Sequence, residues 1–301
     1  MPAPDSSYLQ RAGAFMKNAS RRYAPREPTI DTTKASIARV YSYYLGGKDH
    51  FPVDREMANY AEDVVPGVTE LALGNRAFVQ RATRYLAAER GLRQFLDIGS
   101  GLPTDGNVHE IAHESTREAR VVYIDKDPIV QAHARALLAD NATTTVLAED
   151  LLQPETILAE AERSGLIDLT KPVALMLGGI LHHIEDHDDP AGLTRRLCAA
   201  LCPGSYLVIS HFCRPDEADF PEDADHARRL EVAFMAKLKA GRWRSTEQVR
   251  AYFGDWSLVE PGLVPLNNWR PLPPSAKVPG SYLMPARNMR LIIGGVAVKE
   301  P

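Results

Sequence analysis

The sequence predicts an α/β fold in which helices cover both faces of a mostly parallel sheet. Short apolar segments bounded by turn residues alternate with helical patterns between residues 94 and 210. Such alternation is typical of crossover units in a parallel sheet. A glycine turn, Gly99-Ser100-Gly101, directly follows the first of these segments. Ligands bind at this position in open parallel sheets, so the turn favours a binding site at the carboxyl end of the sheet.

The N-terminal third of the sequence precedes the first predicted strand and is expected to form two parts. Residues 1–30 are polar, show little periodicity and read as a loose lead-in. Residues 31–90 predict a helical cap. Within it, Asp31-Thr32-Thr33 would cap a helix that begins near Lys34 and ends at Gly46-Gly47. Val68–Glu89 is a second long helical pattern.

Residues 91–301 predict the sheet itself, as one ligand-binding domain. The strands are expected at Gln94–Ile98, Arg120–Ile124, Thr144–Ala148, Val173–Leu177, Tyr206–Ser210, Ser257–Val259 and Arg290–Val298. The helices are expected near Asn107–Thr116, Pro128–Ala139, Pro154–Ser164, Ala191–Leu201 and Asp223–Ala240. Ser245 and Gln248 predict a capping box, and Pro261–Pro285 reads as an ordered loop.

Composition excludes several classes of protein. The chain has 301 residues, a net charge of −4 and 45% hydrophobic residues. It contains no run of the ~18 apolar residues that a membrane helix needs. An acidic balance argues against a protein that mainly binds nucleic-acid phosphates. Its three cysteines predict no disulfide framework or zinc ribbon, which favours a reducing cytoplasm.

The glycine turn narrows the ligand class. Dinucleotide enzymes prefer G-x-G-x-x-G, but Thr104 stands where the third glycine would be. Asp97 lies two residues before the first glycine, where its carboxylate would repel a pyrophosphate. The same carboxylate suits S-adenosylmethionine, which carries an ammonium and a sulfonium. A turn with a purely structural role is the alternative.

Carboxylates also follow the second and third strands. Asp125 is placed to accept hydrogen bonds from ribose hydroxyls, a role that NAD and S-adenosylmethionine sites share. A helix cap is its alternative role, which Asp127 fills better. Asp150 could accept from an adenine amino group while Leu151 packs on the ring, or it could be a plain loop carboxylate.

Several segments resemble a bacterial family of S-adenosyl methyltransferases, most of whose members have no assigned substrate. The resemblance covers residues 30–300. It is strongest at Leu-Gly-Gly-Lys-Asp, residues 45–49, and at Gly-Leu-Pro-Thr, residues 101–104. It continues through Ala38–Phe51, Asn75–Phe78, Asp97–Thr104, Asn107–Glu110, Val122–Asp125, Leu181–His183 and Gly294–Ala297. The sequence departs from the family at Ser42 and His50, where Asp and Asn are usual. We expect neither change to abolish cofactor binding, although His50 could alter the pocket mouth.

The resemblance implies a class I, Rossmann-like methyltransferase fold of seven strands, the last inserted antiparallel. It implies S-adenosylmethionine as cofactor and S-adenosylhomocysteine as product. The glycine turn would lie against the amino-acid part, Asp125 would bind ribose, and the N-terminal cap would close over the site. The full set of expected cofactor residues is Asp97, Gly99, Ser100, Gly101, Leu102, Asp125, Lys126, Asp150, Leu151, Gly178, Tyr44, Gly46, Gly47 and Arg76.

The fourth strand leads into Leu181-His182-His183, which this fold class places opposite the transferred methyl group. His182 or His183 is therefore the candidate general base, because imidazole titrates near neutrality. Either histidine could instead cap or pack the next segment. Residues 182–189 contain metal-ligand residue types without a recognised spacing, and we expect a solvated loop and no metal.

The sequence says less about the methyl-acceptor substrate than about the cofactor. The fourth strand lacks the motifs of DNA-base methyltransferases, and we expect Trp243 and Trp269 to be structural with an arginine beside each, not to stack on bases. The sequence predicts methyl transfer to oxygen or nitrogen of a small molecule by a monomer or homodimer. A catalytically silent S-adenosylmethionine- or nucleoside-binding protein is one alternative. An NAD-dependent oxidoreductase is another, which Asp97 disfavours.

Overall fold

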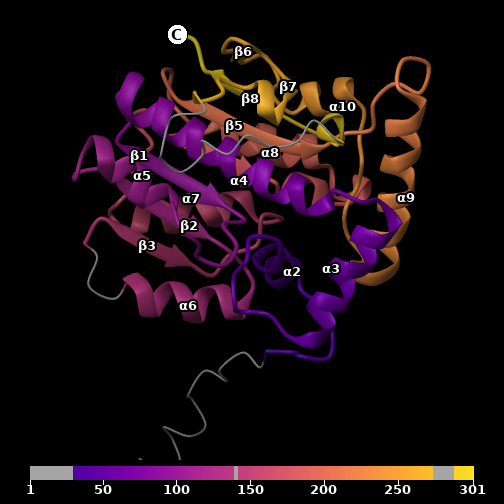
Figure 1. The fold of residues 1–301 in the computed structure, drawn as a ribbon. Helices are drawn as coiled ribbons and strands as arrows, with labels where there is room; N and C mark the ends of the chain where they lie inside the picture. The colour runs from indigo at the N-terminus through magenta and orange to yellow at the C-terminus, as the bar shows by residue number, and fades with distance from the viewer. Residues whose placement is uncertain (1–29, 139–141, 274–287) are drawn as a thin grey trace, which may run out of the picture. The chain divides into compact units, whose positions relative to one another are not determined.

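A mostly parallel sheet organises the computed structural model, which describes residues 30–138, 142–273 and 288–301 (Figure 1). The strand order is β3-β2-β1-β4-β5-β8-β6, and β7 pairs with β8. Strands β1 to β5 run parallel, whereas β8 is antiparallel to β5, β6 and β7. The strands are β1 Gln94–Ile98, β2 Arg120–Ile124, β3 Thr144–Leu147, β4 Ala174–Gly178, β5 Tyr206–Phe212, β6 Ser257–Leu258, β7 Val264–Pro265 and β8 Ile292–Val298.

This topology confirms the predicted fold class. The inserted antiparallel strand is β8, and the two-residue β7 is an addition to the seven expected strands. The helices are α2 Ile37–Tyr44, α3 Pro52–Val64, α4 Val68–Arg84, α5 Val108–Ser115, α6 Pro128–Leu138, α7 Pro154–Arg163, α8 Pro190–Ala199, α9 Pro221–Leu238 and α10 Thr246–Ala251. The capping box at Ser245 and Gln248 is present at the start of α10.

Two hydrophobic cores lie on opposite faces of the sheet, because alternate side chains of a strand point to opposite sides. Phe95 of β1 belongs to the core that includes α4 and α5, and its neighbour Leu96 belongs to the core that includes α7 and α8. All five residues of β1 are buried. Burial on both faces explains why these strands read as continuous apolar runs.

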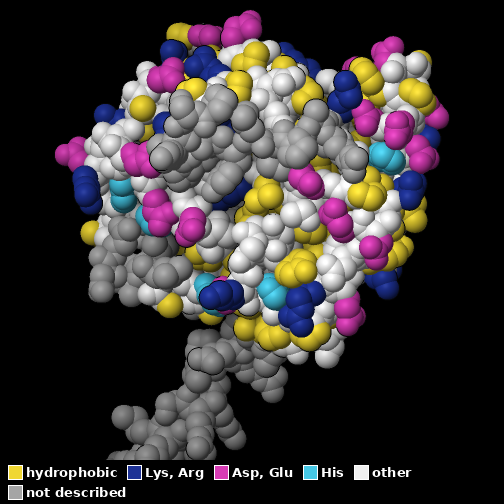
Figure 2. All heavy atoms as spheres, in the orientation of Figure 1, with side chains coloured by type: hydrophobic (Ala, Val, Ile, Leu, Met, Phe, Trp, Pro, Cys, Tyr) yellow, Lys and Arg dark blue, Asp and Glu magenta, His cyan; other side chains and the backbone are white. Residues whose placement is uncertain are grey.

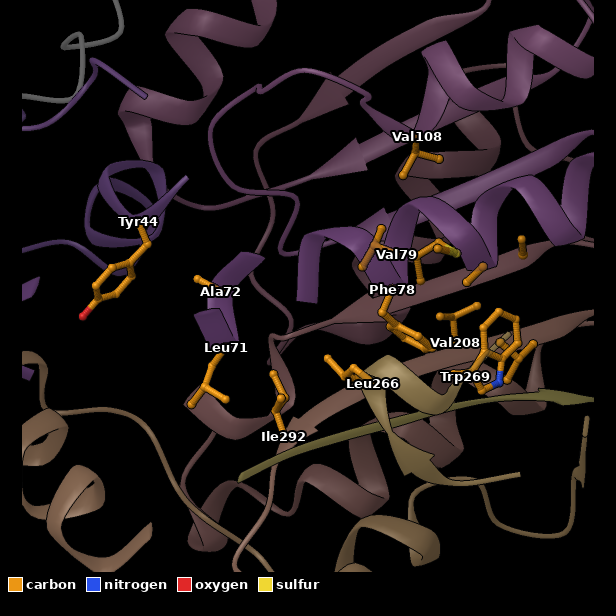
Figure 3. Close-up of a cluster of buried hydrophobic side chains, with 14 of the residues drawn as sticks. Tyr44, Leu71, Ala72, Phe78, Val79, Val108, Val208, Leu266, Trp269 and Ile292 are labelled. Carbon is orange, nitrogen blue, oxygen red and sulfur yellow. The ribbon is translucent and has the colours of Figure 1, made fainter. Parts of the chain in front are cut away.

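Helix α4 ties the N-terminal cap to the C-terminal part of the chain. Phe78 packs edge-on against Trp269, with ring centroids 5.4 Å apart (Figure 3). The buried guanidinium of Arg81 donates to the carbonyl oxygens of Leu266 at 2.7 Å and Trp269 at 3.0 Å. Accordingly, the segment from Thr32 to Pro301 forms one compact unit.

The start of α2 differs from the prediction. The helix begins at Ile37, not near Lys34, and its N-cap residue is Ser36, whose side chain does not cap it. The Ser36 hydroxyl instead donates to Asp127 Oδ2 at 2.7 Å. The local signal at Asp31-Thr32-Thr33 was therefore misleading, because a tertiary contact decides where the helix begins.

Helix α3 was not predicted. It begins with Pro52, which is favoured in the first turn because it lacks an N–H there. The Phe51 N–H donates to Asp54 Oδ2 at 2.8 Å, and Asp54 also accepts from the buried Arg39. Together with the apolar spacing of Met57 and Ala61, the Pro52 and Asp54 signal could have located this helix.

Some expectations lie outside the described residues: nearly all of the lead-in, Ala139 as the last residue of the helix expected at Pro128–Ala139, and residues 274–285 of the expected loop. Within the described residues, none of the helices combines the length and apolarity needed to span a bilayer.

Candidate functional site

A cavity of about 420 Å³ opens at the carboxyl ends of β1, β2 and β4. Here the strand order reverses: β2 and β3 lie on one side of β1, and β4 and β5 lie on the other. Such a switch point is the ordinary ligand site of open α/β sheets, and the volume is in the range of small-molecule pockets. Of the expected cofactor residues, those that line it are Tyr44, Arg76, Asp97, Gly99, Ser100, Gly101, Asp125, Lys126, Asp150, Leu151 and Gly178.

The glycine turn follows β1 in a conformation that favours glycine. Gly99 has φ of 72° and Gly101 has φ of 68°, values that other residues adopt only with strain. Gly99 N–H donates to Ile124 O at 2.8 Å, which ties the turn to the end of β2. A Cβ on Gly99 would lie 2.5 Å from Cγ1 of Ile180. Both conformation and space therefore require glycine at position 99.

Asp97 presents a buried carboxylate to the cavity. Its residue is only 8% exposed, and among the described residues no group hydrogen bonds with it. Burial raises the pKa of Asp97 to about 7; the nearby Arg76 lowers it and Asp125 raises it. A buried carboxylate without a hydrogen-bond partner is costly. Asp97 is therefore suited to a cationic hydrogen-bond donor.

Asp125 lies at the end of β2 and already organises the backbone around it. Its Oδ2 accepts from Gly101 N at 2.9 Å, and its Oδ1 accepts from Asp127 N at 2.9 Å. Burial raises its pKa. Asp127 in turn accepts from Ile129 N in the first turn of α6. The capping role thus belongs to Asp127, and two lone-pair positions of the Asp125 carboxylate stay available for a ligand.

The segments that follow β2 and β3 form an ion pair at the edge of the cavity. Lys126 Nζ lies 2.9 Å from Asp150 Oδ2, and the two side chains are 66% and 33% exposed. Asp150 Oδ1 also accepts from Leu152 N at 3.1 Å. Leu151 is buried and lines the cavity. The apolar side chain of Leu151 and the Asp150 carboxylate, each of whose oxygens already accepts one hydrogen bond, therefore both face this edge of the cavity.

Three expected cofactor residues do not reach the cavity. Leu102 packs with Ile129 and Val130 in a separate small hydrophobic cluster. Gly46 is exposed and Gly47 packs on the buried Ser42, where a Cβ would overlap the Ser42 hydroxyl. The glycines at the end of α2 thus serve the turn itself, and Ser42, one of the two departures from the family pattern, packs against Gly47.

His50 does not line the cavity either. Its Nδ1 lies 3.2 Å from Nη1 of Arg55, which is in the first turn of α3. The expected effect of His50 on the pocket mouth is therefore not supported by its position.

His182 and His183 both line the cavity but have different surroundings. His182 Nδ1 accepts from Phe212 N at 3.3 Å, and its ring stacks on Phe212 at 3.6 Å. His183 Nδ1 is buried and has no hydrogen-bond partner among the residues that the structure describes. Burial lowers the pKa of His182 well below its usual value and that of His183 to about 3. Both imidazoles are therefore neutral at physiological pH.

Sequence reasoning missed the aromatic side chains at the other end of the cavity. Phe212 follows the end of the predicted fifth strand, Phe234 lies on α9, and Trp243 comes after α9. Phe212 stacks on Trp243 at 4.1 Å, and Phe234 packs edge-on against both rings. Only the apolar spacing on α9 hinted at them, because residues from separate elements converge here.

The remaining alternatives can be compared with the structure. Trp243 and Trp269 are 2% and 0% exposed, so neither presents a ring for base stacking. On the face shown in Figure 2, Lys and Arg side chains are interspersed with Asp and Glu, without a single basic patch. Within the described ranges, no group of three His, Cys, Asp or Glu side chains is placed to hold a metal ion.

Comparison with known proteins identifies relatives of the whole fold. A family model described as S-adenosyl methyltransferase matches residues 23–300. A DUF574 family protein from Streptomyces avermitilis MA-4680 is 36% identical with a TM-score of 0.81, over 91% of this chain and 100% of that chain. A protein from Thermobifida fusca YX, provisionally assigned as a methyltransferase, is 39% identical with a TM-score of 0.79, over 91% and 98%.

More distant similarity concerns the fold alone. The plantazolicin methyltransferase BamL, solved with a triazolic desmethyl analogue and S-adenosylhomocysteine, is 10% identical with a TM-score of 0.50, over 88% of this chain and 96% of that chain. A search of curated proteins finds no match to this sequence.

Proposed function

We propose that this chain, which belongs to the S-adenosyl methyltransferase family, transfers a methyl group from S-adenosylmethionine to oxygen or nitrogen of a small acceptor molecule bound in the same cavity. The observation that carries the proposal is the Asp97 carboxylate. It is buried at the switch point of the sheet, lines the cavity and has no hydrogen-bond partner among the described residues.

The amino-acid end of the cofactor fits the groups around Asp97. An α-ammonium would supply the charge-assisted hydrogen bond that the Asp97 carboxylate lacks. Arg76 Nε is also buried without a partner, while its Nη2 donates to Asn107 Oδ1 at 3.1 Å. We expect the free N–H of Arg76 to bind the α-carboxylate. This pairing satisfies two buried polar groups of opposite charge at once.

The nucleoside end fits the tips of β2 and β3. Each oxygen of Asp125 accepts one backbone N–H and keeps a lone pair for a ribose hydroxyl. Leu151 offers an apolar surface for adenine, and Asp150 remains the candidate acceptor for its amino group. Lys126 holds Asp150 in place through their ion pair.

S-adenosylmethionine supplies an electrophilic methyl group on a sulfonium. The task of the protein is to align a nucleophile with that group and to exclude water. Apolar side chains from α2, α4 and α9 close the acceptor end of the cavity. Of the two histidines, His183 is the better placed base, because the Nδ1 of His182 already accepts a backbone hydrogen bond.

Calorimetric titration with S-adenosylhomocysteine tests the cofactor site. Asp97→Asn should weaken binding roughly 10- to 100-fold, the cost of losing a hydrogen bond to a charged group. Asp125→Ala should weaken it at least about tenfold for the same reason. Asp105→Asn is the matched control, because this exposed acid lies in the same loop and does not line the cavity. Unchanged affinity in Asp97→Asn would contradict the proposed orientation.

A further inference from the structure

The half of the cavity away from the strand tips has a distinct chemical character. Its walls come from α2, α4, α9, Phe212, Trp243 and the start of β8. Figure 3 shows four of these side chains, Tyr44, Leu71, Ala72 and Ile292. The charged residues that line the cavity are confined to the cofactor half: Arg76, Asp97, Asp125, Lys126, Asp127, Glu149 and Asp150. The acceptor half therefore contains no counter-charge for an ionised substrate.

Two glutamates outside the cavity, Glu185 and Glu231, form ion pairs with Arg242. Glu185 Oε2 lies 2.5 Å from Arg242 Nη2, and Glu231 Oε1 lies 3.2 Å from Arg242 Nη1. Glu231 Oε2 also accepts from Trp243 N at 2.9 Å. Neither glutamate lines the cavity. An ammonium group in the acceptor half would thus be desolvated without a partner, which is costly.

Aromatic rings form one wall of this half. His182, Phe212 and Trp243 stack in series, with interplanar angles of 14° and 8° and centroid separations of 3.6 Å and 4.1 Å. Phe234 packs across them edge-on at 81° to 84°. Planar rings pack favourably in offset or edge-on arrangements against such walls. The shape and chemistry of the wall favour a planar aromatic substrate.

The polar groups of the acceptor half are nearly all satisfied internally. Tyr41 Oη donates to Ala72 O and accepts from Asn75 Nδ2, and Asn75 Oδ1 accepts from Ser210 Oγ at 2.5 Å. Tyr44 Oη donates to Ala58 O. Within the described part of the chain, two ring nitrogens of this half lack hydrogen-bond partners, His183 Nδ1 and Trp243 Nε1. The indole N–H can only donate, so His183 offers the available acceptor.

His183 is held rigidly in this position by the loop that follows α9. Arg242 N donates to His182 O at 2.7 Å. Arg244, which is 4% exposed, donates to Leu181 O at 3.2 Å and to Ile184 O at 2.7 Å. The carbonyl groups on both sides of His183 are thus fixed, and its imidazole is presented to the cavity by a braced backbone.

We propose that the methyl acceptor is a neutral aromatic hydroxyl compound whose O–H donates to the imidazole of His183 while its ring packs edge-on against Phe212 and Phe234, which line the cavity. This inference rests on the proposed methyltransferase function. In the transfer, a lone pair of the hydroxyl oxygen forms the new O–C bond, and the C–S bond breaks with its electron pair going to sulfur. The hydroxyl proton passes to the imidazole of His183. Because this half of the cavity contains no counter-charge for an imidazolium, His183 hands the proton on to solvent, and the positive charge of the sulfonium leaves the cavity with it.

Binding to the complex with S-adenosylhomocysteine tests the substrate class without requiring turnover. The probes are 2-naphthol, 2-naphthoate and 2-naphthylmethylammonium, which share one ring system and differ in charge. Calorimetry should show that 2-naphthol binds at least about tenfold more tightly than either charged probe. Equal or tighter binding of a charged probe, or no binding of 2-naphthol, would overturn the inference.

Variants of His183 separate the hydrogen bond from packing. His183→Phe keeps an aromatic ring and should weaken 2-naphthol binding roughly three- to tenfold, the worth of one hydrogen bond. His183→Asn retains a polar acceptor on a shorter side chain; it should restore binding to within about threefold but should not form 2-methoxynaphthalene from S-adenosylmethionine. His187→Ala, a change of an exposed histidine in the same loop, should leave both unchanged.

Each protein is first titrated with S-adenosylhomocysteine alone. If the unmodified chain does not bind S-adenosylhomocysteine, the proposed function itself is refuted. Normal cofactor binding together with unchanged 2-naphthol affinity in His183→Phe would refute only the role of His183 and the substrate class.

Discussion

The two ends of the cavity are built in different ways. The cofactor end consists of the tips of β1, β2 and β3: Asp97 lies near the end of β1, and Asp125 and Asp150 follow β2 and β3. The acceptor end consists of side chains from helices and loops that are distant in sequence, and among the described residues it contains no charged side chain. Strand order thus positions the groups that bind the cofactor, whereas packing between separate helices shapes the acceptor space.

The two ends also titrate in opposite directions. Burial lowers the pKa of His183 and of His211, which lies behind it, to about 3, below their ordinary 6.5. Their stabilising contribution is present above pH 6.5 and is lost as the pH falls towards 3. Burial raises the pKa of Asp97 to about 7, above its ordinary 3.8. The folded state therefore gains stability from Asp97 as the pH falls through 7.

The largest expected effect follows from this opposition. Between pH 7 and pH 5, the titration of each of the two histidines should lower the free energy of unfolding by about 2 kcal/mol. The titration of Asp97 should raise it by about 2 kcal/mol over the same range. Asp97→Asn removes only the compensating part. Its loss of stability on acidification, measured by urea unfolding, should exceed that of the unmodified chain by about 2 kcal/mol. Parallel curves for the two proteins would show that Asp97 does not titrate in this range, with Asp105→Asn as control.

The difference in destabilisation between variants of the two turn glycines should be smaller, about 1–2 kcal/mol. Gly99→Ala introduces both an unfavourable φ and a contact with Ile180, and should lower the free energy of unfolding by about 2–3 kcal/mol. Gly101→Ala has an unfavourable φ but no atom within 4 Å of the new Cβ, and should lower it by about 1 kcal/mol. Equal destabilisation would show that close packing on Ile180 is not what requires glycine at position 99.

A carboxylate placed at the acceptor end should reverse its preference. Leu238, near the end of α9, is partly exposed and lines the cavity. Leu238→Glu should increase the affinity for 2-naphthylmethylammonium about tenfold, because it supplies the missing counter-charge, and should leave S-adenosylhomocysteine affinity within about twofold. Ala236→Glu places the same charge on an exposed position of α9 as control. Equal gains in both variants would indicate a general electrostatic effect instead of a site effect.

The smallest effect concerns the link between the cap and the cofactor end. Ser36 Oγ donates to Asp127 Oδ2 at 2.7 Å, beside Asp125. Ser36→Ala should weaken S-adenosylhomocysteine binding by at most about fivefold, since one hydrogen bond contributes about 1 kcal/mol. Binding of 2-naphthol to the complex should change less than the cofactor affinity. A larger loss for 2-naphthol would show that the cap acts mainly on the acceptor end.

The same contrast explains what could be predicted from sequence. The bounds of β1 and β2 were predicted correctly, and Asp97 and Asp125 line the cavity as expected, because each is encoded by a short local pattern. The positions of Leu102, Gly46 and Gly47 could not be settled this way. Glycine and leucine signals show where the chain turns or packs but not which side of the turn faces a ligand.

The acceptor end shows where local patterns carry too little information. Phe212, Phe234 and Trp243 come from β5, α9 and the following loop, and no fixed spacing connects them. The beginning of α2 is a similar case, since the Ser36 side chain bonds to Asp127, 91 residues away. Features that depend on contacts between distant segments need the three-dimensional arrangement of those segments.

The most direct test of the cofactor site is the number of protons released when S-adenosylhomocysteine binds at pH 7. With a pKa of about 7, Asp97 is half protonated before binding, and an ammonium partner should drive its remaining proton off. Calorimetry in two buffers of different ionisation enthalpy should therefore show release of about half a proton, lost in Asp97→Asn. No release, or equal release in the variant, would contradict the assignment of Asp97 as the partner of the cofactor ammonium.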